Sequence, residues 1–196
     1  MFNHAFLISL RLLIFRAGPQ DFPFDTGKTL SRACIAFAIV AYALFWLVVS
    51  PPGAALAIAV VTVIAMALVT RGTLALRKVP ERFQQTFNAL LAINGLLTLA
   101  MIPPFAKVAP PLIELFSQLQ AHPELADQPD KWPQLSGGAS AVLNVLGFWQ
   151  LAVTSRIYAQ ASNGNVFGGV LLALLAMLAI SLLLLFLSPV IGLLLV

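Results

Sequence analysis

The sequence contains little charge, one cysteine and two histidines. Asp, Glu, Lys and Arg together make up 9% of the 196 residues, whereas hydrophobic residues make up 60%. A soluble domain of this length cannot bury so much apolar surface in one core, so lipid must cover much of it. The composition therefore excludes an ordinary soluble protein and indicates a protein embedded in a membrane.

The scarcity of reactive side chains excludes further classes. The only cysteine, Cys34, cannot form an intramolecular disulfide, and we interpret it as a small apolar residue. The formal net charge is +4, but the basic residues are divided among short loops and form no continuous patch. We therefore expect no nucleic-acid partner and attribute the positive charge to membrane topology and anionic lipid.

The sequence does contain five apolar runs that are long enough to cross a hydrocarbon core about 30 Å thick as helices. We predict a single membrane domain, 1–196, folded as an all-α polytopic helical bundle with five transmembrane helices. A cytoplasmic interfacial segment, 1–29, precedes the first span, and an external loop, 104–138, follows the third. The predicted spans are residues 30–49, 54–70, 86–103, 139–157 and 166–188.

The basic residues lie mostly on one side of this predicted bundle. Nine of the eleven are near span ends on that side, namely Arg11, Arg16, Lys28, Arg32, Arg71, Arg77, Lys78, Arg82 and Arg156. The other side carries Lys107 and Lys131 together with the acidic residues Glu114, Glu124, Asp127 and Asp130. Because Lys and Arg near span ends favour the cytoplasmic side, we predict that the N-terminus is cytoplasmic and the C-terminus is outside.

Two segments outside the spans also have helical patterns. Residues 2–16 are apolar but are interrupted by Arg11 and Arg16, which predicts a helix lying at the cytoplasmic interface. After it, Asp21 and Asp25 are expected to be solvated or to cap helices. In the external loop, PPLIELFSQLQ predicts a short amphipathic helix on the outer surface, separated from the third span by Pro103-Pro104.

The predicted spans lack the groups that most intramembrane chemistry requires. They contain no Asp, Glu, His or Lys, which disfavours a proton-coupled carrier or an intramembrane protease. His4 and His122 fall on opposite sides of the membrane and cannot share a metal ion. No serine-nucleophile motif is present. We therefore expect no catalytic residue, no metal and no cofactor, and the chain is not expected to be an enzyme.

Amide side chains are the most informative polar groups within the spans. Asn94 and Gln150 lie at similar predicted depths in the third and fourth spans, so they are expected to form an interhelical polar contact, in which we include Asn144. The contact has two interpretations, a structural link between helices or a substrate-contacting site. In the fifth span, small residues including Gly169 and Ala173 indicate close helix packing.

The connection between the second and third spans is strongly basic. Arg71, Arg77, Lys78 and Arg82 lie beside the predicted cytoplasmic leaflet, where each basic residue contributes about 1 kcal/mol to the binding of anionic phospholipids. We predict that these four residues bind anionic phospholipids of the bilayer. The alternative is that they only orient the chain during insertion.

Two stretches carry a family resemblance. ERFQQTFNALLAINGL at 81–96, and FWQLAVTSRIYAQASNG at 148–164 followed by VFGGVLLALL, resemble the entry into the third span and the fourth-to-fifth span region of the Yip-domain family. The order of elements over about residues 15–188 is also similar to that of its bacterial members, relatives of the Rab-interacting membrane proteins of eukaryotes. The resemblance implies five spans with the N-terminus inside and the C-terminus outside.

The resemblance also implies a general role. It indicates an integral membrane scaffold or accessory protein of a bacterial inner membrane, acting through lipids and a protein partner. The clustered Asn and Gln side chains support an alternative, a small-molecule transporter or channel. Amides that line a water-filled path would favour transport, whereas tight packing around them would favour the scaffold.

Overall fold

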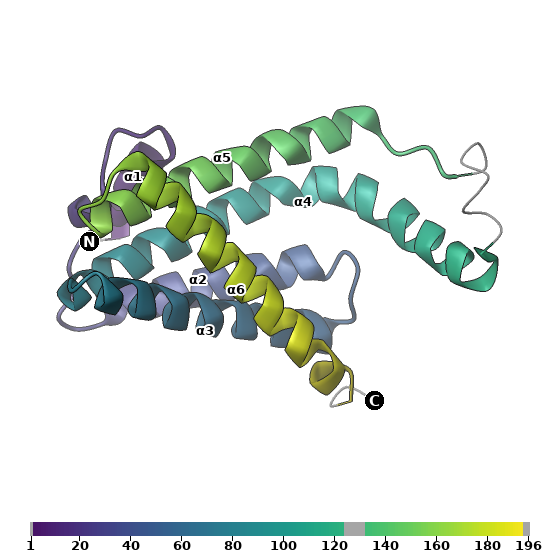
Figure 1. Cartoon of the computed structure of the whole chain (residues 1–196), viewed down its shortest axis with the longest axis horizontal. Helices are drawn as coiled ribbons and strands as arrows, with labels where there is room; N and C mark the ends of the chain where they lie inside the picture. Colours follow the sequence, from purple (N-terminus) through teal and green to yellow (C-terminus); the bar gives the residue numbers. More distant parts are fainter. Residues whose placement is uncertain (1, 124–131, 194–196) are drawn as a thin grey trace.

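The computed structural model describes residues 2–123 and 132–193, and within these ranges the chain is helical with no strand (Figure 1). The elements are α1 (Phe2–Leu13), η1 (Pro19–Asp21), α2 (Thr29–Trp46), α3 (Pro52–Leu76), η2 (Pro80–Arg82), α4 (Phe83–Ala121), α5 (Gly137–Ala161) and α6 (Val166–Leu193). The helices α2 to α6 are long and apolar enough to cross a membrane, which confirms the five predicted apolar helices and indicates an integral membrane protein.

The two aspartates between α1 and α2 bind backbone amides of this segment. This agrees with helix capping, one of the two roles predicted for them. Asp21 Oδ2 accepts a hydrogen bond from the Gly18 amide at 2.7 Å. Asp25 accepts from the Gly27 amide at 2.9 Å and from the Leu30 amide at 2.5 Å. The amides at the start of a helix have no intrahelical acceptor. The bond from the Leu30 amide to Asp25 therefore stabilises the first turn of α2.

The helices α2 and α3 form an antiparallel hairpin joined by the short connection of residues 47–51. Pro52 occupies the first turn of α3, where its missing N–H would have had no intrahelical partner. The hairpin therefore follows from local sequence alone.

The first half of α4 is the centre of the bundle. Residues 86–95 are all buried, and α4 contacts α1, α2, α3 and α5. At Gly95 the absence of a side chain matters, because an added Cβ would lie 2.6 Å from a ring carbon of Phe37 on α2. The helices α2, α3 and α5 pack around this segment, and the spanning helices leave their outer faces exposed, for example at Leu68 and Leu178.

The second half of α4 departs from the sequence prediction. Residues 104–138 were expected to be an external loop containing a separate short helix, but α4 continues without a break to Ala121. Pro103, Pro104, Pro110 and Pro111 all lie inside it. A proline removes one helical hydrogen bond and bends a helix without always ending it. Accordingly, α4 bends over this half (Figure 1).

The connections with the predicted cytoplasmic charge all lie at one end of the bundle. The N-terminal segment, the α3–α4 connection and the α5–α6 connection are together at the left of Figure 1, and the α2–α3 connection is at the opposite end. Four of the residues that were assigned to the external side lie outside the described residues, namely Glu124, Asp127, Asp130 and Lys131. The basic connections thus lie at one end of the bundle, away from the α2–α3 connection. Which end faces the cytoplasm stays a prediction.

The helix α6 packs against α5 and α3 through small residues. Ala173 is fully buried and Ala176 is 4% exposed. A Cβ added at Gly169 would clash with the Ser155 carbonyl oxygen and would lie 2.7 Å from the Ala159 Cβ. The close approach of α5 and α6 therefore depends on the small residues that the sequence pattern indicated.

Candidate functional site

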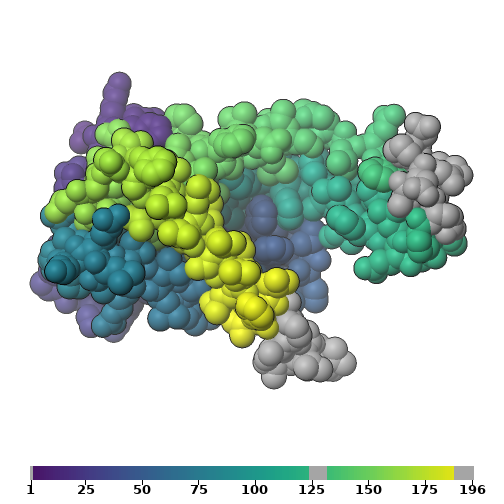
Figure 2. Space-filling model, in the orientation of Figure 1, coloured from purple at the N-terminus to yellow at the C-terminus, as the bar shows by residue number. Residues whose placement is uncertain are grey.

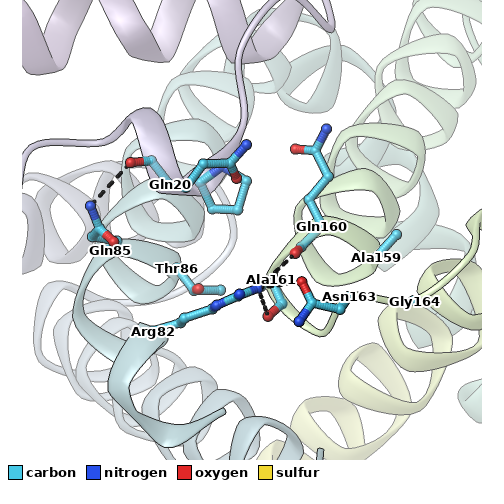
Figure 3. Close-up of a pocket in the computed structure, with 10 residues that line it drawn as sticks. Gln20, Arg82, Gln85, Thr86, Ala159, Gln160, Ala161, Asn163 and Gly164 are labelled. Carbon is cyan, nitrogen blue, oxygen red and sulfur yellow. Dashed lines mark hydrogen bonds between the residues drawn. The ribbon is translucent and has the colours of Figure 1, made fainter.

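A polar cavity of about 590 Å³ lies at the basic end of the bundle (Figure 3). Its walls come from η1, from η2 and the start of α4, and from the end of α5 with the turn that follows it. We call it the end cavity. It is lined by Pro19, Gln20, Arg82, Gln85, Thr86, Ala159, Gln160, Ala161, Asn163 and Gly164. Among these lining residues Arg82 carries the only charge.

Arg82 joins the start of α4 to the end of α5. Its Nη1 donates to the carbonyl oxygens of Gln160 at 3.3 Å and Ala161 at 3.1 Å, and to Asn163 Oδ1 at 2.7 Å. The last carbonyls of a helix lack intrahelical donors and carry partial negative charge, so a guanidinium is favourable there. Arg82 therefore has a structural role that the sequence pattern did not predict.

The other three basic residues of the predicted lipid-binding group have a different environment. Arg71 lies near the end of α3, and Arg77 and Lys78 lie in the connection that follows. All three side chains are exposed. The structure thus places them at the same end of the bundle as Arg82 and leaves their charges accessible, whereas the Arg82 guanidinium is engaged with α5.

Sequence reasoning missed two glutamines at the start of α4. Gln85 Nε2 donates to the carbonyl oxygens of Gln20 at 3.1 Å and Phe22 at 2.8 Å, and Gln84 Nε2 donates to the carbonyl oxygen of Asp25 at 2.6 Å. These bonds hold the segment between α1 and α2 against α4 and so form one wall of the end cavity. The only available signal was a pair of adjacent amides just after the helix start at Pro80.

Two oxygen atoms of the end cavity have no hydrogen-bond partner. Thr86 is only 1% exposed, and its Oγ1 is buried without a partner, as is Oε1 of Gln160. Buried polar atoms are nearly always paired, and an unpaired one typically costs about 1–3 kcal/mol. Both residues line the end cavity, and a ligand that donates hydrogen bonds would satisfy the two atoms if their side chains turned toward it.

The predicted pair of amides is brought together within the apolar part of the bundle. Gln150 Nε2 donates to Asn94 Oδ1 at 2.6 Å, and Asn94 Nδ2 donates to the Leu90 carbonyl oxygen at 2.9 Å. The pair lines a cavity of about 300 Å³ among α2, α3, α4, α5 and α6. Thr154 also lines it, with its Oγ1 buried and unpartnered.

Asn144 does not belong to this contact. It is exposed on α5, six residues before Gln150. Six residues rotate a helix by about 240°, so the two side chains point away from each other. Including Asn144 in the interhelical contact was wrong, because it lies about 9 Å along α5 from Gln150 and on another face of the helix.

Two further interhelical hydrogen bonds were missed. The hydroxyls of Thr70 on α3 and Tyr158 on α5 are 3.0 Å apart. Asn88 Nδ2 on α4 donates to Ser31 Oγ on α2 at 2.9 Å. Polar contacts thus connect several pairs of spans, and the Asn94–Gln150 bond is one member of this set.

Comparison of the chain with protein-family models, with curated proteins and with solved structures finds no match. Within residues 2–123 and 132–193, no group of three or more His, Cys, Asp or Glu side chains is placed to hold a metal ion.

Replacing Asn94 or Gln150 with Leu should lower the free energy of unfolding by no more than about 2 kcal/mol, because interhelical hydrogen bonds in membranes contribute about 0.5–2 kcal/mol. Unfolding of the purified protein in detergent measures this change. Asn144→Leu, at an exposed position of the same helix, is the matched control and should leave stability unchanged. A loss well above 2 kcal/mol would mean that the pair does more than link two helices.

Proposed function

We propose that this chain is an integral membrane scaffold or accessory protein of the Yip-domain type, which acts through a protein partner and anionic phospholipids of a bacterial inner membrane. The observation that carries the proposal is the division of α4 into two parts. Residues 86–95 are enclosed by the bundle, whereas farther along the helix Ile113 is 50% exposed and Phe116 is 63% exposed.

The exposed part of α4 also extends beyond the bundle. Figure 2 shows it projecting past the α2–α3 connection. Ile113 and Phe116 are three residues apart and therefore lie on one face of the helix. A scaffold needs such a surface, because a helix anchored inside the bundle positions its exposed continuation rigidly for a partner.

A photo-crosslinking amino acid at Phe116 should form a discrete protein adduct in intact cells. Leu178, which is 56% exposed on α6 and is expected to face lipid, is the matched control and should give no protein adduct. Electrophoretic mobility followed by mass spectrometry of the adduct measures the result. Absence of an adduct at Phe116, or equal adducts at both positions, would contradict a partner at this surface.

The exposed charges of Arg71, Arg77 and Lys78 support the lipid part of the proposal. In the predicted orientation they lie beside the anionic cytoplasmic leaflet, where basic residues are attracted to the surface. Arg82 contributes less to such a surface, because its guanidinium is bonded to the end of α5.

A small-molecule transporter or channel is the second candidate, and the cavity beside Asn94 and Gln150 is the observation that favours it. The Gln150→Leu variant separates the two candidates. A transporter would lose the uptake of small polar solutes into proteoliposomes while keeping its fold. A scaffold would show no such uptake in either the variant or the unaltered protein.

A further inference from the structure

A second cavity, of about 750 Å³, lies between α5 and α6 at the basic end of the bundle. We call it the α5–α6 cavity. It shares Ala159, Gln160 and Gly164 with the end cavity, so the two adjoin along the last turn of α5. Because Gln160 belongs to both walls, a ligand in one cavity can contact groups that line the other.

Arg156 provides an accessible positive charge in the α5–α6 cavity. Its side chain is exposed, and its Cζ lies 5.5 Å from the centre of the Phe15 ring. Phe15 packs in turn on Trp149 with ring centres 5.2 Å apart, and Trp149 Nε1 donates to the Leu13 carbonyl oxygen at 3.1 Å. These contacts position the guanidinium. No acidic residue is among the residues described as lining either cavity.

Polarity changes along the α5–α6 cavity. Gln160 and Asn165 line its polar part, whereas Ala152, Val166 and Val170 also contribute to its wall. From Ala152 to Gln160 the helix rises about 12 Å. Arg156 lies one turn from Gln160 on the same face of α5. The cavity thus offers an apolar wall beside a guanidinium and a hydrogen-bonding end, which suits an amphipathic ligand that carries a phosphate.

We propose that the two adjoining cavities form one binding site for an anionic glycerophospholipid whose headgroup is a phosphate ester of a polyol. The acyl chains contact the wall that includes Val170, and the phosphate binds Arg156. The Gln160 and Thr86 side chains turn toward the headgroup, and its hydroxyls donate to Gln160 Oε1 and Thr86 Oγ1, the two buried oxygens without partners. This inference deepens the lipid-binding part of the proposed function and rests on it.

The charges around the cavities favour a polyol over an ammonium headgroup. An ammonium group would lie near the Arg82 guanidinium with no carboxylate among the lining residues to pair with, and like charges repel. A glycerol headgroup carries no charge of its own and supplies the hydroxyl donors that the two unpartnered oxygens need. The site should therefore distinguish phosphatidylglycerol from phosphatidylethanolamine.

Native mass spectrometry of the full chain, with phosphatidylglycerol and phosphatidylethanolamine at equal concentration, tests this inference. The unaltered protein should retain phosphatidylglycerol preferentially. Arg156→Gln should weaken its binding about 10- to 100-fold, as expected for a lost hydrogen bond to a charged group. Gln160→Leu should weaken it about 2- to 10-fold and reduce the preference over phosphatidylethanolamine. Arg32→Gln makes the same charge change at an exposed residue outside both cavities and should have little effect.

The possible outcomes bear on the proposal in different ways. Equal losses in Arg156→Gln and Arg32→Gln, or equal retention of the two lipids by the unaltered protein, would overturn it. Excess glycerol 1-phosphate should fail to displace the lipid, because the free ester lacks acyl chains for the apolar wall. Displacement by it would assign the site to a soluble phosphate ester instead. If the unaltered protein bound both lipids equally but still formed the crosslink at Phe116, this site would be refuted and the proposed partner surface would stand.

Discussion

Replacing Gly169 with Ala should destabilise the bundle by about 1–3 kcal/mol, the usual cost of inserting a methyl group into a well-packed core. The new Cβ would clash with the Ser155 carbonyl oxygen and lie 2.7 Å from the Ala159 Cβ. Neither group is the end of a flexible side chain, so α5 and α6 must move apart. Thermal unfolding in detergent should show a lower Tm.

Gly147→Ala is the matched control for this change. Gly147 lies on α5, and no atom within 4 Å would meet its added Cβ. The same methyl group therefore meets open space there, and Ala favours a helix over Gly. We expect stability to be unchanged or slightly raised. Equal losses at the two glycines would show that the close approach of α5 and α6 does not determine the effect.

Cysteine labelling in intact cells should modify Gln120→Cys from outside and leave Leu76→Cys unlabelled. The expectation follows from the one-sided distribution of Lys and Arg, which predicts a cytoplasmic N-terminus. Both positions are exposed, and Leu76 is 87% exposed, so differences in labelling report the side of the membrane. The test uses a Cys34→Ala background, because Cys34 is the only natural cysteine.

The structure also improves the choice of labelling sites. Phe2 and Ser162 are predicted to be cytoplasmic and Val196 external, but Ser162 is only 8% exposed and Val196 lies outside the described residues. Asn163 is exposed and adjacent to Ser162, so it replaces Ser162 as the cytoplasmic reporter. Labelling of Leu76→Cys and Asn163→Cys in intact cells, with Gln120→Cys reached only after permeabilisation, would reverse the topology.

The number of spanning helices could be predicted because it depends on the length of apolar runs, a property of local sequence. The Asn94–Gln150 contact could be suggested from depth along two antiparallel helices. Asn144 did not meet this depth criterion, since it lies about 9 Å along α5 from Gln150. Which face of α5 it occupies could not be predicted, because packing sets the rotation of a helix about its axis.

Tertiary contacts account for the other differences. Arg82 looks like its basic neighbours in sequence, yet it caps α5, a helix that begins more than fifty residues later in the chain. Gln84 and Gln85 hold a backbone segment that contains no matching polar pattern. The end cavity forms where three segments that are distant in the sequence meet. No pattern of residues within any one of these segments predicts it.

We expect the four prolines of α4 to limit how deep this helix sits in a bilayer. Each lacks the N–H that would bond the carbonyl four residues earlier, so the oxygens of Leu99, Ala100, Ala106 and Lys107 lose their usual donors. Hydrocarbon offers no replacement, whereas water and lipid headgroups do. From Phe83 to Pro103 the helix rises about 30 Å, the thickness of the hydrocarbon core. The prolines thus act as a depth marker, and beyond them we expect α4 to continue in the aqueous phase.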